Sequence, residues 1–246
     1  MRKVWWVVGV GVLCLPMLFV IWLLAAVRWT RMDAWTLRMP TGVRRTVAQL
    51  AFQKVGWDKG SLPRLERVIV LDPKNADAWG RRCTDYKDAE AAKAHVQTCQ
   101  TAVALDATPE NLDALGRAQE ALGDPCAADA SFTKAAGNTS EQAYLYVEDT
   151  GRAALRCGDL YGARAGLETA ILQEDKSLKE PDQDEEEIDD TKADQLTDRE
   201  YLVVTLDRLH EQGLSKDACS AAHPDWAGCA CALGAKGEVS CKDAAH

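Results

Sequence analysis

The sequence lacks an excess of positive charge. Its 29 lysines and arginines are outnumbered by 38 aspartates and glutamates, which gives a formal net charge of -9 at pH 7. A protein that neutralises nucleic-acid phosphates normally presents a basic face, and no stripe of lysines or arginines supplies one. We therefore expect no nucleic-acid partner.

The sequence also lacks the short motifs that carry enzyme chemistry. It contains no G-x-x-x-x-G-K-[ST] phosphate loop, no H-E-x-x-H zinc helix, no G-x-S-x-G nucleophile turn, no G-x-G-x-x-G after a strand and no EF-hand loop. His95 falls on an expected helix, where a structural or surface role is the common one. We predict that the protein is not an enzyme and has no catalytic site, metal or cofactor.

One long segment lacks charge altogether. Val4 to Val27 contains no Asp, Glu, Lys or Arg, and it is longer than the roughly 20 residues that a helix needs to cross a bilayer. It follows Arg2 and Lys3, and no small-x-small cleavage site comes after it. Interfacial tryptophans flank it, at Trp5, Trp6 and Trp29. This pattern predicts an uncleaved, single-pass transmembrane signal-anchor helix at 4–27.

A repeating pattern follows this segment. Between Ala114 and Ala135 the sequence carries two Leu-Gly pairs, then Ala128 and Phe132, and ends in Lys-Ala. The last helix-contact position recurs at separations of 34, 33 and 35 residues, at Val68, Ala102, Ala135 and Ala170. The pattern resembles the tetratricopeptide repeat (TPR), a helix-turn-helix unit of about 34 residues.

The resemblance covers residues 41–175 and implies an all-α fold. Four units are expected, at 41–74, 75–108, 109–138 and 141–175. Because one unit cannot bury its own apolar face, stacked units share a continuous core and present a concave surface. The expected architecture is an N-terminal transmembrane helix, then a TPR-type helix-turn-helix solenoid, then a Cys-rich irregular tail.

The resemblance also implies that the concave side binds a protein or peptide. The first-helix positions that line this side in the family correspond to Arg81, Thr84, Asp113, Arg117, Glu148 and Arg152. The Lys and Asn that clamp a C-terminal carboxylate in some members are missing, which argues against that clamp. Arg117 and Arg152 occupy equivalent places in adjacent units, which is compatible with a mixed-charge groove for an extended peptide. A solvated face with ordinary ion pairs is the favoured interpretation of these charges.

The composition changes after Asp175. The segment 176–196 is acidic and contains a proline, which predicts a solvated linker and, as an alternative, a lure for basic partners. A helix from Thr197 to Gln212, ended by Gly213, is expected to pair with a second helix broken at Pro224. These helices and the Cys-rich tail form a C-terminal segment at 197–246.

Eight of the nine cysteines follow the apolar segment, and an even number favours disulfides in an oxidising compartment. They are Cys83, Cys99, Cys126, Cys157, Cys219, Cys229, Cys231 and Cys241. The TPR register predicts that Cys83 faces Cys99 within one unit and that Cys126 meets Cys157 across two units.

The four tail cysteines leave two connectivities open. Cys219 pairs with Cys229 and Cys231 with Cys241, or Cys219 pairs with Cys231 and Cys229 with Cys241. Zinc bound by these thiolates, with or without His210 or His223, or thiol-redox chemistry in the same tail, is an alternative interpretation.

The charge and cysteine patterns disagree about topology. Five arginines just after the apolar segment favour a cytoplasmic C-terminal bulk, whereas disulfides require an oxidising side. Giving the cysteines more weight, we predict a single-pass protein of the bacterial inner membrane with a periplasmic bulk. The expected function is a membrane-anchored TPR scaffold for protein or peptide partners in the cell envelope. A cytoplasm-facing docking adaptor and a metal or redox function of Cys219–Cys241 are the alternatives.

Overall fold

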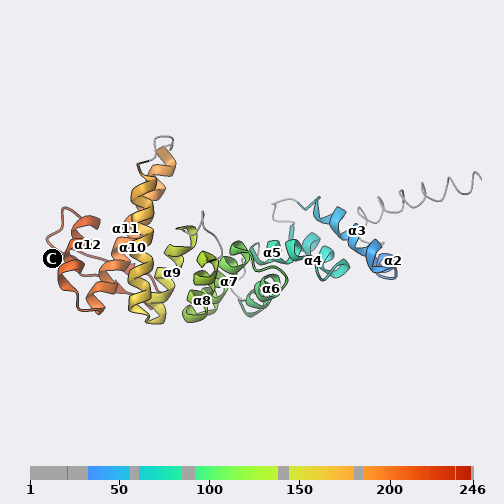
Figure 1. Ribbon diagram of the computed structural model, residues 1–246, viewed down its shortest axis with the longest axis horizontal. Coiled ribbons are helices and arrows are strands. Elements are labelled where there is room, and N and C mark those ends of the chain that lie inside the picture. Colours follow the sequence, from blue (N-terminus) through green and yellow to red (C-terminus); the bar gives the residue numbers. More distant parts are fainter. Residues whose placement is uncertain are drawn as a thin grey trace, which may run out of the picture. The chain divides into compact units, whose positions relative to one another are not determined.

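The computed structural model describes residues 21, 33–55, 61–84, 92–137, 144–179, 185–235 and 237–244. The chain divides into two compact units, Met1–Lys87 with Ala104–Asp106, and Asp88–Val103 with Ala107–His246. The described part is helical except for one short hairpin near the C-terminus (Figure 1). Each unit is described below by itself.

The first unit contains four of the helices, which are α2 (Asp33–Thr36), α3 (Thr41–Phe52), α4 (Ser61–Leu71) and α5 (Ala76–Thr84). Helix α4 packs against both α3 and α5. Val47 of α3, Leu65 and Val68 of α4 and Ala78 of α5 have no exposed surface and form its core. The side chain of Asn75 accepts a hydrogen bond from the Ala78 amide at 2.9 Å and so caps the start of α5.

The second unit holds the remaining helices and the hairpin. The helices are α6 (Ala92–Leu105), α7 (Pro109–Leu122), α8 (Pro125–Gly137), α9 (Tyr144–Cys157), α10 (Leu160–Ser177), α11 (Glu185–Arg208) and α12 (Gln212–Ala222). From α7 to α12 each helix packs against the next in the chain, as the green-to-orange helices of Figure 1 show. Short turns join α7 to α8, α9 to α10 and α11 to α12, and the chain reverses direction at each of them.

The turn between α7 and α8 shows why the chain reverses there. Gly123 adopts a left-handed backbone conformation, with φ of 85°, which ends α7. The Asp124 carboxylate then accepts a hydrogen bond from the Ala127 amide at 3.1 Å. Pro125 is the first residue of α8, where its missing N–H costs nothing. One helix therefore ends at Leu122 and the next begins at Pro125.

A close helix approach fixes the packing of α7 on α8. A Cβ atom at Gly116 would lie 2.5 Å from Cε1 of Phe132, so only glycine fits beside that fully buried ring. The register positions Val68, Ala102, Ala135 and Ala170 are all buried on α4, α6, α8 and α10. The predicted TPR-like helical-repeat fold is confirmed.

The acidic segment corrects one expectation. The linker predicted at 176–196 is wrong from Glu185 onward, because α11 runs from Glu185 to Arg208. Acidic residues near a helix N-terminus are favoured by the helix dipole, and the later turns bury Val204 and Leu206 in the second unit's core. Burial of the C-terminal half therefore stabilises a helix that the acidic composition alone does not predict.

The sequence predicts an irregular Cys-rich tail, but part of this tail forms a hairpin. Strands β1 (Ala232–Leu233) and β2 (Val239–Ser240) pair antiparallel, with Ala232 opposite Ser240 and Leu233 opposite Val239. The Tyr201 hydroxyl of α11 donates to the Gly237 carbonyl at 2.6 Å and so ties the hairpin to that helix. The tail is thus a folded part of the second unit.

The transmembrane helix requires a further correction. The predicted span at 4–27 lies outside the described residues except for Ile21. Across the helices that the structure describes, none combines the length and apolar character needed to cross a bilayer. The predicted fold class is therefore corrected to the helical repeat and its C-terminal helix pair, and the predicted inner-membrane location loses its structural basis.

Candidate functional site

Charged side chains on α7 and α9 form the first part of the candidate site. The Arg117 guanidinium on α7 lies 3.0 Å from the Asp113 carboxylate on the same helix and 2.7 Å from Asp149 on α9. Although Arg117 bridges two carboxylates, 61% of its side chain is exposed. A second pair, Arg156 of α9 with Glu120 of α7, spans the same two helices at 2.8 Å. The first helices of adjacent units are thus tied by two ion pairs.

Arg152 continues this network from α9 to α11. Its guanidinium contacts Glu148 one turn earlier on α9 and lies 2.8 Å from Asp198 on α11. It also lies over the Tyr201 ring, 5.4 Å from the ring centroid, within the range of a cation–π contact. Arg152 is therefore the cation at the junction between α9 and the C-terminal helix pair.

Three carboxylates gather around this junction. Glu148 of α9, Glu174 of α10 and Asp198 of α11 each place one oxygen so that these oxygens lie within 4.8 Å of one another. Burial raises the pKa of Glu174 to about 8, with further increases from the neighbouring Asp198 and Glu148. Burial likewise raises the pKa of Asp198 to about 7, although Arg152 opposes the shift. The raised pKa values favour the neutral, protonated form of both carboxyl groups at this crowded junction.

The structure brings four of the predicted groove residues together. Asp113, Arg117, Glu148 and Arg152 all belong to the ion network of α7 and α9, where they pair with one another or with Asp149 and Asp198. The other two lie in the first unit. There Arg81 donates to the Val55 carbonyl at 3.1 Å, and the Thr84 hydroxyl donates to the Arg81 carbonyl at 3.0 Å.

A polar cleft lies on the first unit as well. It has a volume of about 550 Å³ and is bordered by α3, by the start of α5 and by the turn that joins α4 to α5. Arg45 and Asp72 line it with their charges 3.6 Å apart. Like α7 and α9, helices α3 and α5 open their predicted repeat units. Charged groups of both signs therefore line this cleft as well.

Asp149, Glu174 and Asp198 belong to the site but are not among the groove residues predicted from the sequence. Asp149 directly follows the predicted Glu148, and its helical position carries it toward α7. Asp198 was assigned to the segment after the acidic linker, so nothing in the repeat register pointed to it. Its place within an amphipathic helix, three residues before Tyr201, is the signal that was available.

The eight cysteines in the described part of the chain are all disulfide-bonded. Cys126 at the start of α8 is bonded to Cys157 at the end of α9, with Cα atoms 4.8 Å apart, which is the pair that the TPR register predicts. In the tail, Cys219 is bonded to Cys229 and Cys231 to Cys241, one of the two connectivities left open by the sequence. Cys83 and Cys99 are both buried and both disulfide-bonded.

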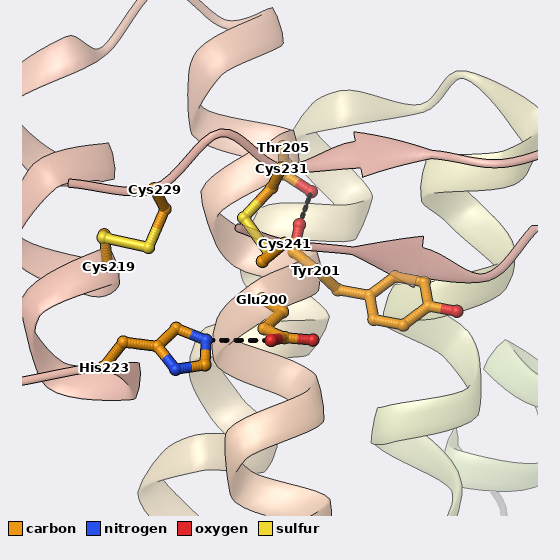
Figure 2. Close-up of a disulfide and its surroundings, with 8 residues drawn as sticks. All are labelled: Glu200, Tyr201, Thr205, Cys219, His223, Cys229, Cys231 and Cys241. Carbon is orange, nitrogen blue, oxygen red and sulfur yellow. Dashed lines mark hydrogen bonds and ion pairs between the residues drawn. A yellow bond between two sulfur atoms is a disulfide. The ribbon is translucent and has the colours of Figure 1, made fainter. Parts of the chain in front are cut away.

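One tail disulfide, Cys219–Cys229, joins α12 to the segment before the hairpin, and the other, Cys231–Cys241, closes the hairpin itself. Figure 2 shows both bridges, together with the contact between His223 after α12 and Glu200 of α11. The His223 Nε2 atom lies 2.8 Å from the Glu200 carboxylate, and its ring stacks on Trp226 with centroids 3.6 Å apart. The four tail cysteines form two disulfides, so none of them is a free thiolate that could bind zinc.

Comparisons with known proteins agree with the fold. No protein-family model and no curated protein matched the chain. Among solved structures, MamA protein is similar over 74% of this chain and 89% of its own, with 15% identity and a TM-score of 0.54. The Cut9–Hcn1 hetero-tetramer of APC/C covers 74% of this chain and 35% of its own, at 16% identity and a TM-score of 0.45.

A third structure is PilW, a widely conserved type IV pilus biogenesis factor. It matches 75% of this chain and 89% of its own, at 19% identity and a TM-score of 0.43. At these identities the likeness concerns the fold alone. Of these three structures, MamA protein is the one with a TM-score above 0.5. That similarity supports the helical-repeat architecture described above.

Proposed function

We propose that the protein is an interaction scaffold that binds a protein or peptide through the surface formed by α7 and α9. Helical repeats of this kind expose the first helix of each unit as an extended binding surface. The proposal assigns no catalytic step to the chain.

The observation that carries this proposal is the environment of Arg117. Its guanidinium is held in place by Asp113 and Asp149 but remains mostly exposed, so it can bind a carboxylate without first being ordered. The neighbouring acidic groups offer complementary contacts to basic side chains. We therefore infer that the partner is an extended segment carrying charges of both signs, and that its binding weakens as ionic strength rises.

The oxidised chain is proposed to be the working form. The Cys126–Cys157 bridge holds α8 against α9 next to this surface. A fixed helix pair binds a partner without an ordering cost that a looser pair would carry. The four tail cysteines form two disulfides, so they do not support the alternative redox or metal function.

Reversing one charge on α7 and, as a control, one charge on α8 tests the proposal. The full chain, its Arg117→Glu variant and its Lys134→Glu variant would each be cross-linked in cells that naturally produce the protein, and the adducts identified by mass spectrometry. Lys134 is exposed on α8, a second helix, and provides the matched control. We expect specific adducts with wild type and Lys134→Glu that are lost with Arg117→Glu. The same adducts in all three samples would place the binding surface elsewhere.

A further inference from the structure

Three helices bring carboxylates to one point where α9, α10 and α11 meet. Glu148, Glu174 and Asp198 come from separate helices, and one oxygen of each lies within 4.8 Å of the other two. Their neighbours in the sequence do not create this grouping, since the residues are separated by whole helices. The packing of the fold itself produces it.

A second observation concerns atoms that have no partner. The Asp198 side chain has no exposed surface, and only its Oδ1 atom contacts Arg152. Its Oδ2 atom is buried and receives no hydrogen bond from any described residue, and the same is true of Oε2 of Glu174. An acceptor buried without a donor destabilises the fold, and more so when it is charged. A cation held by both residues would satisfy these oxygens.

The charges that face the group are unevenly balanced. Arg152 is the principal cation, with a weaker contribution from Arg117 at Glu148. The opposing carboxylates are the three members themselves, with Asp194 of α11 near all of them and Asp149 near Glu148. When all three carboxyl groups are ionised, one nearby guanidinium leaves a net negative charge, which a divalent ion would compensate.

The donor set indicates which ion fits. All three ligands are carboxylate oxygens, which are hard donors that suit Ca²⁺ and Mg²⁺ rather than zinc or copper. Opposite ligands of a Ca²⁺ ion lie about 5 Å apart, whereas those of Mg²⁺ lie about 4 Å apart and demand stricter geometry. A flexible shell assembled from three helices and completed by water matches Ca²⁺ better.

We propose that Glu148, Glu174 and Asp198 bind one Ca²⁺ ion, while Arg152 keeps its contacts to Glu148 and Asp198. The ion would bond the buried oxygens that now have no donor. It would also join the last predicted repeat, α9 and α10, to α11 of the C-terminal helix pair. This site borders the proposed partner surface, because Glu148 and Arg152 lie on α9, and it goes beyond the scaffold function.

Calcium titration of the full chain tests the site. After removal of metal with EDTA and exchange into chelator-free buffer, CaCl₂ would be added up to about 10 mM, since sites outside calcium-buffered cells bind in the range of about 0.1–1 mM. Isothermal titration calorimetry and the thermal midpoint would be followed. We expect one ion per chain and a saturable rise in the midpoint. Absence of both, or an equal response to MgCl₂ at matched ionic strength, would overturn the proposal.

Two variants separate the site from general electrostatics. Glu174→Gln removes a ligand whose Oε2 accepts no hydrogen bond from the described part of the protein, so the fold should tolerate it. We expect a tenfold or larger loss of calcium affinity. Glu168→Gln is the control, because Glu168 lies on the same helix but binds Arg164, and it should bind calcium as wild type does. Equal affinities in wild type and Glu174→Gln would refute the assignment.

Discussion

Arg152 on α9 lies 2.8 Å from Asp198 on α11, whose side chain is completely buried. This ion pair connects the last predicted repeat to a helix that the repeat pattern does not include. A pair in such a place has two consequences. It fixes which face of α11 turns toward α9, and it makes each partner depend on the other for its stability.

Replacing Arg152 with methionine should strongly destabilise the protein. The substitution keeps much of the apolar side chain but leaves Asp198 as a buried carboxylate without its counter-ion. Removing one member of a buried pair costs about 3–5 kcal/mol, and we expect a loss of that order in the free energy of unfolding. Urea denaturation at neutral pH in the presence of EDTA measures it.

A double-mutant cycle identifies the cause. Asp198→Asn in the Arg152→Met background removes the orphaned charge, so the double variant should be more stable than Arg152→Met alone. If the two losses simply add, the pair is not coupled and the ion pair does not explain the junction.

Much of the repeat could be predicted from sequence because its constraints are local. Gly123 and Asp124 mark a helix stop and start by backbone and capping chemistry that does not depend on distant residues. Four buried positions recur at the repeat length, so their burial follows from periodicity. They are Val68, Ala102, Ala135 and Ala170. The meeting of Cys126 and Cys157 follows from the same register, because each cysteine lies at the end of a neighbouring antiparallel helix.

The junction could not be predicted because its constraints come from tertiary packing. An acidic run normally favours solvent, and only the burial of residues such as Val203 and Leu206 makes 185–208 one helix. Glu174 lies near the end of a repeat unit and Asp198 beyond it, so no single motif contains both. The choice between the two tail connectivities likewise depends on how the hairpin packs, which spacing does not specify.

The bridge between Cys126 and Cys157 should contribute measurably to stability. It closes a loop with a sequence separation of 31 residues. In the chain-entropy model a bridge of this span is worth about 3–4 kcal/mol. We therefore expect the Cys126→Ser/Cys157→Ser double variant to unfold at a clearly lower guanidinium concentration. Cys14→Ser is the control, since it alters no cysteine of the described bridges, and an unchanged midpoint in the double variant would contradict the prediction.

Gly116→Ala tests the close approach of α7 to α8. The added methyl group would lie 2.5 Å from Cε1 of the Phe132 ring, which is fully buried. Overpacking of this kind costs about 1–3 kcal/mol, and the thermal midpoint should fall accordingly. Gly213→Ala is the matched control. No atom lies within 4 Å of a Cβ there, so alanine should be neutral or slightly stabilising. A variant at Gly116 as stable as wild type would show that the two helices pack less closely.

Asp129 should make stability depend on pH at the edge of α8. Burial raises the pKa of its carboxyl, and the negative charge of Asp159 raises it further, while a hydrogen bond from Thr133 opposes the shift. Because the folded pKa lies above the unfolded value, the stabilising contribution is fully present below the unfolded pKa and is lost as pH rises through the folded one. Charged Asp129 therefore weakens the fold at neutral pH.

Asp129→Asn should accordingly raise the thermal midpoint at pH 7 and lose this advantage in acid, where wild-type Asp129 becomes neutral as well. The gain should stay below about 1 kcal/mol, because water screens a partly exposed carboxylate. Melting curves from pH 3 to pH 8 would measure the difference between variant and wild type at each pH. Asp217→Asn makes the same chemical change on the exposed face of α12. If Asp217→Asn gave the same pH-dependent gain, the change in net charge would be responsible, and not the burial of Asp129 and its repulsion by Asp159.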